Sequence, residues 1–271
     1  MNKQRKLLVF VFILAIATSN ENLYGQQNSN HNIKVALIYT GTSPELVESV
    51  EREIKEQLGV HVELMNYAVP SALEEIRKTG YVTATPAAKM VKTYMEAVEA
   101  GADAILNICS SVGDVVYSVQ DLAKYLGVPI VMVNDEMCRE AVRKGNKIAI
   151  MATLSTSIEP TRNILLRVSR EMGKHVEVVT VLVDGAYGLD QEQFKAQMAA
   201  EAEKIADQVD VIVFAQGSMA YCEKFIADRF QKTVLSNSYF GAKALKNALI
   251  DKGIAVCSTI QHIPDGSDWG M

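Results

Sequence analysis

The feature that most constrains the fold is a regular alternation of short apolar runs with longer amphipathic segments. In the first half of the chain the pattern predicts strands over 34–39, 60–65, 103–108 and 129–133, and helices over 44–58, 84–100, 113–126 and 136–143. Ser43 is a suitable N-cap for the first helix, Pro44 a suitable first residue, and Gly59 a suitable end. Strands that alternate with helices at this spacing form parallel sheets covered on both faces.

The alternation then begins again. It predicts strands over 147–152, 176–183, 209–214 and 234–235, and helices over 157–172, 191–206, 219–229 and 240–252. Two successive rounds predict an α/β protein with two similar Rossmann-like lobes. We expect residues 33–145, together with about 237–271, to form the first lobe and residues 146–236 the second.

The composition is that of a globular protein. The 271 residues are 49% hydrophobic and 22% charged, and the formal net charge is −5. Charges of both signs are spread along the sequence without a basic stripe, so a nucleic acid is not an expected partner.

The first 32 residues form a separate leader. Lys3, Arg5 and Lys6 precede an apolar run over 7–17, which is shorter than the ~20 residues that span a bilayer. This order is typical of a secretory signal peptide over about residues 1–25 and predicts export, to the periplasm, with no stable membrane anchor after cleavage. An uncleaved anchor, or a remnant of a protease-site tag suggested by the letters ENLYGQ, are the alternatives.

Four predicted strands end in loops that are rich in small hydroxyl residues. In open α/β sheets, ligands bind beyond the carboxyl ends of the strands, and N–H and hydroxyl groups at helix N-termini bind anions. We therefore expect a small carboxylate to be bound by Thr40, Thr42, Ser43, Ser110, Ser111, Thr153, Thr156, Gln216, Gly217 and Ser218. Helix capping explains each loop equally well when it is taken alone.

Cys109 is the candidate catalytic residue, because it lies at a strand end beside a helix N-terminus. That position predicts a lowered thiol pKa and a thiolate that acts as nucleophile or base. A buried structural cysteine is the alternative. Cys138, Cys222 and Cys257 are expected to be packed or incidental, although four cysteines in an exported chain also permit disulfides. The sequence has no C-x-x-C spacing, so no metal site is expected.

Four motifs in order resemble one family. They are NICSSVGDVV at 107–116, VPIVMVNDEMCREAV at 128–142, IAIMATLSTSIEPT at 148–161 and VIVFAQGSMA at 211–220. Together they resemble the aspartate/glutamate/hydantoin racemase superfamily, and most of all its uncharacterised bacterial branch with C-S-S-I/V-G and A-Q-x-S-M motifs. The resemblance extends from Lys34 to Lys252.

The resemblance implies a cofactor-independent racemase or epimerase of a small amino acid or related carboxylic acid. It also implies two lobes related by a pseudo-two-fold axis with a ligand cleft between them, and a homodimer as one assembly. In such enzymes one thiol removes the α-proton and a second thiol returns it on the opposite face. By motif, Cys109 is the first thiol, Ser110 and Ser111 are its carboxylate-binding neighbours, and Thr153 and Thr156 reach the cleft.

The resemblance breaks at the second thiol, where Gly217 and Ser218 stand in this sequence. Glycine cannot move a proton, and Cys222 is expected inside a helix. Two other functions therefore stay open. One is a one-thiol isomerase or decarboxylase of a small carboxylic acid, and the other is a non-catalytic exported carboxylate-binding protein. The loop at 184–188, DGAYG, is expected to be either a lid over the cleft or an ordinary turn.

Overall fold

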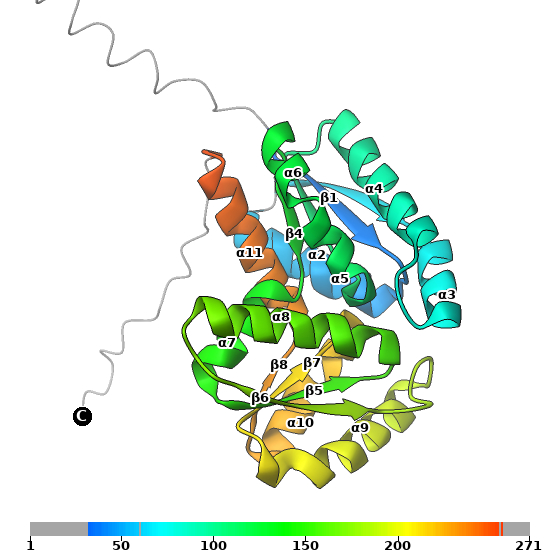
Figure 1. Ribbon diagram of the computed structural model, residues 1–271, viewed down its shortest axis with the longest axis vertical. Coiled ribbons are helices and arrows are strands. Elements are labelled where there is room, and N and C mark those ends of the chain that lie inside the picture. The colour runs from blue at the N-terminus through cyan, green and yellow to red at the C-terminus, as the bar shows by residue number, and fades with distance from the viewer. Residues whose placement is uncertain (1–31, 60, 255, 257–271) are drawn as a thin grey trace, which may run out of the picture. The chain divides into compact units, whose positions relative to one another are not determined.

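The computed structural model describes residues 32–59, 61–254 and 256 (Figure 1). The predicted signal peptide, the leader before residue 32 and Cys257 lie outside the described residues, so those expectations stay predictions. Both sheets of the structure belong to one compact unit, which begins at Ile33.

The first sheet has four parallel strands in the order β2-β1-β3-β4. Its strands are β1 (Lys34–Tyr39), β2 (Glu63–Ala68), β3 (Ala104–Asn107) and β4 (Ile130–Met132). The helices of this part of the chain are α2 (Pro44–Leu58), α3 (Pro70–Thr79), α4 (Ala84–Glu99), the 3-10 helix η1 (Ser110–Val112), α5 (Gly113–Ser118), α6 (Gln120–Leu126) and α7 (Asp135–Lys144).

The second sheet repeats this plan with four parallel strands in the order β6-β5-β7-β8. Its strands are β5 (Lys147–Ala152), β6 (Glu177–Leu182), β7 (Val211–Phe214) and β8 (Thr233–Leu235). The helices here are η2 (Ser155–Ser157), α8 (Ile158–Glu171), α9 (Gln191–Ile205), η3 (Ala206–Gln208), η4 (Gly217–Cys222), α10 (Glu223–Phe230) and α11 (Asn237–Asp251). The predicted α/β fold with two parallel sheets is confirmed, and the shared strand order makes β1, β2, β3 and β4 the counterparts of β5, β6, β7 and β8.

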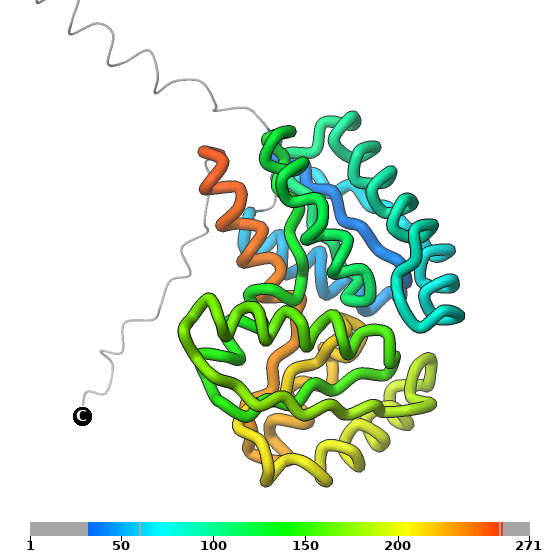
Figure 2. The backbone as a smooth tube through the Cα atoms, viewed as in Figure 1, coloured from blue at the N-terminus to red at the C-terminus, as the bar shows by residue number. Residues whose placement is uncertain are grey.

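Helices are exchanged between the two sheets. The last helix, α11, packs against α2, β3 and β4 of the first sheet, and Figure 2 shows the orange tube of α11 returning there from the second sheet. The helix that follows β4, α7, contacts β7 and β8 of the second sheet as well as α11. Although α7 lies before residue 145 in the chain, it therefore packs on the second sheet.

The two sheets are held by apolar residues of their central strands. Residues 35–39 of β1, 104–107 of β3, 148–152 of β5 and 211–214 of β7 are all buried, because helices cover both faces of a parallel sheet. The outer strands β2 and β6 are partly exposed. Within the part of the chain that the structure describes, no helix has the length and apolar character needed to cross a membrane.

Several elements differ from the sequence-based expectation. The helix expected over 113–126 is divided into α5 and α6, and the helix expected over 219–229 begins as the 3-10 helix η4 and continues as α10. The strand expected over 60–65 is β2, shifted toward the C-terminus because it pairs in parallel with β1, with Lys34 beside Glu63 and Tyr39 beside Ala68. The helix α3 was not expected. It begins at Pro70, buries Leu73 and its neighbours on one face, and ends at Gly80, whose φ of 84° is the left-handed conformation that favours glycine.

Candidate functional site

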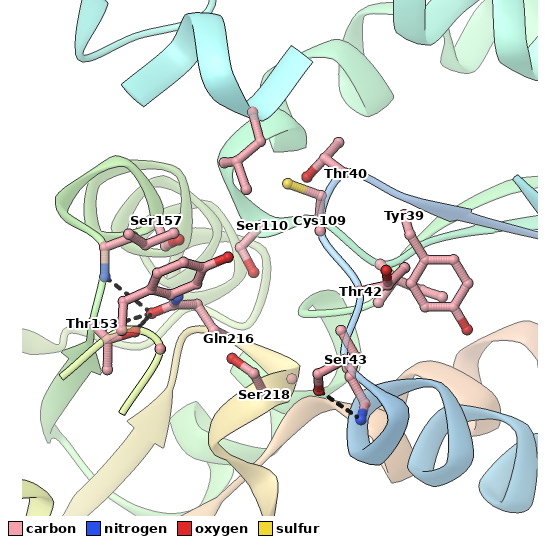
Figure 3. A pocket seen from close by; sticks show the side chains of 18 of the residues that line it. Tyr39, Thr40, Thr42, Ser43, Cys109, Ser110, Thr153, Ser157, Gln216 and Ser218 are labelled. Atoms are coloured by element: carbon pink, nitrogen blue, oxygen red, sulfur yellow. Dashed lines mark hydrogen bonds between the residues drawn. The ribbon is translucent and has the colours of Figure 1, made fainter. Parts of the chain in front are cut away.

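A pocket of about 320 Å³ lies beyond the carboxyl ends of the strands and is lined by loops of both sheets (Figure 3). The loops that follow β1, β3, β5 and β7 all contribute to it. Every predicted site residue except Thr156 lines the pocket, namely Thr40, Thr42, Ser43, Cys109, Ser110, Ser111, Thr153, Gln216, Gly217 and Ser218. The sequence pattern therefore located the pocket, while the roles of the individual residues stay predictions.

Cys109 follows β3 and precedes the 3-10 helix η1. Cys109 is a free cysteine and is partly exposed as a residue, and its thiol faces into the pocket (Figure 3), whereas Cys138 and Cys222 are free cysteines that are fully buried. The expectation of a lowered pKa is wrong. Burial raises the pKa of the Cys109 thiol above its ordinary value, and this outweighs the lowering by the nearby Thr40 hydroxyl and by the donors of Ser111 and Val112.

Thr40 follows β1 and lies beside Cys109 (Figure 3). Its side chain is only 3% exposed, and its Oγ1 atom has no hydrogen-bond partner among the described residues. A buried hydroxyl without a partner is costly, so this group is available to a thiolate or to a bound ligand. Its effect on the thiol is to lower the pKa of Cys109.

Several predicted ligand-binding hydroxyls instead hold the site together. Ser43 caps α2 by accepting a hydrogen bond from the Leu46 N–H at 3.3 Å. Ser110 donates to the carbonyl of Ala215 in the loop after β7. Ser111 Oγ lies 3.0 Å from Thr156 Oγ1, so Thr156 supports the pocket from behind Ser111 rather than lining it. Thr42 and Ser218 carry no side-chain hydrogen bond to any described residue.

Beneath these loops lies a pair of buried asparagines that sequence reasoning missed. Asn134 Nδ2 lies 3.0 Å from Ser110 Oγ and 3.2 Å from the Ala215 carbonyl, and Asn237 Nδ2 donates to Asn134 Oδ1 at 2.6 Å. Both asparagines are fully buried. The sequence signal that could have identified them is a polar residue at the end of a predicted buried strand. Asn134 is such a residue, and it lies within the motif at 128–142.

Gln216 occupies the donors of the loop after β5. Its Oε1 atom accepts from the Thr153 N–H at 2.6 Å, the Thr153 hydroxyl at 3.2 Å and the Leu154 N–H at 3.3 Å (Figure 3). These are the groups of the second lobe that were expected to bind an anion. Because three donors fix the amide oxygen, the Nε2 atom, which has no partner among the described residues, is the group that Gln216 offers to a ligand.

The register of the sheets identifies Gln216 as the counterpart of Cys109. The Ile108 N–H bonds to the Ile38 carbonyl at 3.0 Å, and the Ala215 N–H bonds to the Met151 carbonyl at 2.9 Å, so Cys109 and Gln216 follow equivalent residues. Each also caps a 3-10 helix, η1 or η4. The sequence comparison, which put Gly217 at the second thiol position, was therefore off by one residue.

Gly217 has a different role in the structure. A Cβ atom on this residue would lie 2.6 Å from Leu46 Cδ1 and 3.1 Å from Asn237 Oδ1, so the first lobe packs directly against its backbone. A larger residue at this position requires Leu46 to move. The glycine is thus explained by a close approach of the two lobes.

The pocket has an apolar side that the sequence analysis did not identify. Leu73 of α3 and Phe194 of α9 contribute to it, and the loop between β6 and α9 adds Tyr187. The Arg77 guanidinium of α3 lies 5.2 Å from the centre of the Tyr187 ring, so the second lobe contacts the first at this end of the pocket. The two expectations for the 184–188 loop, a lid or an ordinary turn, both stay predictions. The unexpected helix α3 explains why Leu73 could not be placed from sequence.

Metal ligands are not gathered in this site. No group of three or more His, Cys, Asp or Glu side chains is arranged to hold a metal ion anywhere in the described ranges. The polar and aromatic side chains that line the pocket comprise one thiol, several hydroxyls, the amides of Gln191 and Gln216, the carboxylate of Glu45 and aromatic rings.

Comparison with known proteins gives a family and a set of similar folds. The sequence profile of the family described as Asp/Glu/Hydantoin racemase matches residues 35–244. Among curated proteins, none matches the sequence.

Solved structures resemble the fold at low sequence identity. A glutamate racemase from Bacillus anthracis has a TM-score of 0.63 and 16% identity, with 83% of this chain and 84% of that chain covered. An allantoin racemase from Klebsiella pneumoniae has a TM-score of 0.56 and 16% identity, covering 83% and 90%. A maleate isomerase from Pseudomonas putida has a TM-score of 0.54 and 14% identity, covering 84% and 98%.

Proposed function

Because the chain belongs to the Asp/Glu/Hydantoin racemase family, we propose that it is a cofactor-independent racemase or epimerase of a small amino acid or related carboxylic acid. Cys109 is the group that removes or returns the proton on the substrate's α-carbon. The observation that carries this proposal is a free cysteine whose thiol faces a pocket of about 320 Å³ at the carboxyl ends of two parallel sheets.

The groups around the thiol fit the chemistry of α-proton removal. Loss of this proton moves negative charge onto the substrate's carboxylate, and hydrogen-bond donors that are already oriented stabilise that charge in the transition state. The Nε2 atom of Gln216 and the hydroxyls of Thr42 and Ser218 are donors without another described partner. Thr40 stabilises the thiolate, since its hydroxyl lowers the pKa of Cys109.

The face of the substrate's α-carbon opposite Cys109 meets different chemical groups. Among the described residues that line the pocket, Cys109 is the single thiol, and its counterpart Gln216 does not titrate. A proton for the opposite face therefore comes from a neutral hydroxyl, such as that of Tyr187, or from water. Proton exchange by Cys109 is then faster than inversion of the stereocentre.

This asymmetry supports a second candidate, a one-thiol isomerase of a small carboxylic acid. In that reaction Cys109 acts on one face of the substrate only. The opposite face then needs no second acid/base group, and an amide that binds the carboxylate is sufficient there. The observation that favours it is that the second lobe has the Gln216 amide at the place equivalent to that of the Cys109 thiol. We also retain export through residues 1–25 as part of the proposal; N-terminal sequencing of the protein recovered from cells tests it.

Proton exchange in deuterated water tests the proposed function. The protein is incubated with a panel of amino, hydroxy and unsaturated acids, α-proton loss is followed by NMR, and configuration by chiral chromatography. We expect exchange with at least one acid and its loss in Cys109→Ser, with Cys138→Ser as the control. Exchange that survives in Cys109→Ser removes the proposed role of the thiol. Inversion as fast as exchange contradicts the one-sided chemistry.

A further inference from the structure

The pocket that holds Cys109 is lined by both polar and apolar groups. The thiol, the Thr40 hydroxyl and the Gln216 amide are the groups that suit a carboxylate and the carbon beside it. If the proposed function is right, the α-carbon lies at the thiol, and the α-substituent must pack against the rest of the lining. The remaining lining residues therefore select the substrate.

Several of these remaining side chains are apolar or aromatic. Leu46 and Leu73 come from the first lobe and Phe194 from the second, and they are 9%, 9% and 5% exposed. The ring of Phe194 lies 5.3 Å from that of Tyr221, which also lines the pocket. Tyr187 adds a further ring from the loop between β6 and α9. Burying an apolar substituent against such a surface is favourable by ~25 cal/mol per Å².

The charge of the lining disfavours a second carboxylate on the substrate. Among the described residues that line the pocket, none is Lys, Arg or His, and the one carboxylate is Glu45 at the start of α2. Burial first of all, then Cys222 and the carboxylates of Glu45 and Asp190, raise the pKa of Tyr221. The Arg77 guanidinium stacks on the Tyr187 ring and does not line the pocket.

We propose that the substrate carries a single carboxylate and that its α-substituent is uncharged and apolar, as in an amino acid with an aliphatic or aromatic side chain. Dicarboxylic acids are the poorer ligands of this site. A dicarboxylate brings a second negative charge to a surface that offers it Glu45 and no cation, and it leaves that charge beside Leu73 and Phe194.

Leucine and aspartate test the proposal directly, since their side chains have nearly the same shape and differ in charge. Binding of both enantiomers of each to the whole protein is measured by calorimetry at pH 7, apart from any turnover. We expect leucine to bind at least about tenfold more tightly than aspartate. Equal or tighter binding of aspartate, or binding of neither, overturns the proposal. Preferential binding of leucine without α-proton exchange overturns the proposed function and leaves the ligand class standing.

Two variants test which residues cause the preference for leucine over aspartate. Glu45→Gln removes an exposed charge and is expected to reduce the ratio of leucine to aspartate affinity severalfold. Leu73→Ala is expected to weaken leucine more than alanine, with Leu122→Ala, an exposed leucine of α6, as the control. If Leu73→Ala weakens binding of leucine, alanine and aspartate equally, the substituent does not pack against Leu73 and the proposal fails.

Discussion

Cys109 and Gln216 stand at equivalent places in the two lobes. Each directly follows a residue whose N–H donates a hydrogen bond to the neighbouring strand, β1 in the first lobe and β5 in the second. One is a proton carrier with its thiol facing the pocket. The other is an amide whose oxygen accepts hydrogen bonds from Thr153 and Leu154 in the neighbouring loop, which follows β5. The duplicated fold thus presents a ligand with an acid/base group from one lobe and a fixed hydrogen-bonding group from the other.

Gln216→Cys should place a thiol in the pocket from the second lobe. We expect the ratio of stereochemical inversion to α-proton exchange to rise at least about tenfold, because a positioned acid/base group contributes 10²–10⁴-fold to proton transfer. Chiral chromatography and NMR in deuterated water measure the two rates on the same sample. Gln216→Ser removes the amide without adding a thiol and serves as the control. An equal ratio in the two variants would argue against Gln216 as the counterpart of Cys109.

Gln216→Glu should weaken carboxylate ligands without disturbing the fold. Glutamate keeps an oxygen for the donors of Thr153 and Leu154, but it replaces the Nε2 donor with a second anionic oxygen. At pH 7 we expect affinity for a carboxylate ligand to fall about tenfold or more, and to recover as the pH falls and the new carboxyl is protonated.

Calorimetry of a carboxylate ligand between pH 4 and pH 8 measures this effect. Gln191→Glu adds the same charge to another residue that lines the pocket, and it is expected to have the smaller effect because Gln191 is exposed. If both variants weaken binding equally, the loss is due to overall charge and Gln216 does not contact the carboxylate.

The activity should increase as the pH rises through the pKa of Cys109. The thiolate is the working form, and burial raises the pKa of this thiol, so the protonated and inactive form predominates near neutrality. We expect kcat/KM of the free enzyme to rise with pH along the ascending limb of its pH profile, and the midpoint of this limb to lie above the ordinary cysteine pKa of about 8.5. The rate of alkylation of Cys109 by iodoacetamide, mapped by mass spectrometry, should follow the same limb.

Thr40→Val should move that limb to still higher pH, because the Thr40 hydroxyl lowers the pKa of Cys109. Thr42→Val, in the same loop, is the control and should leave the limb in place. A limb at or below the ordinary cysteine value, or an unchanged limb in Thr40→Val, contradicts this account of the thiol.

The sequence was sufficient for the sheets because buried parallel strands are short apolar runs. The central strands β1 and β5 have the limits that the apolar pattern predicts, over 34–39 and 147–152. The partly exposed β2 was misplaced because its extent depends on pairing with β1 rather than on its own residues. The helix α3 was missed because its first turn follows directly from β2 with a single intervening residue, Val69.

The site was predictable only as far as the strand ends determine it. The loop of Cys109 and the loop of Gln216 could be assigned to one edge, since the carboxyl ends of parallel strands meet there. Which hydroxyls face the ligand could not, because Ser110 and Ser111 turn to partners in the other lobe. The pKa of Cys109 was predicted in the wrong direction, since burial depends on how tightly both lobes close around it.

The stability of the arrangement should depend on Asn134, which links the two lobes beneath the pocket. Its amide contacts Ser110 Oγ and the Ala215 carbonyl and accepts from Asn237, all away from solvent. Asn134→Ala leaves these buried groups without partners, and we expect the free energy of unfolding to fall by about 2–4 kcal/mol. Asn66→Ala removes an exposed amide that bonds to Glu51 and should cost less than about 0.5 kcal/mol. Urea unfolding of both variants compares the two losses, and equal losses would mean that the buried network does not hold the lobes together.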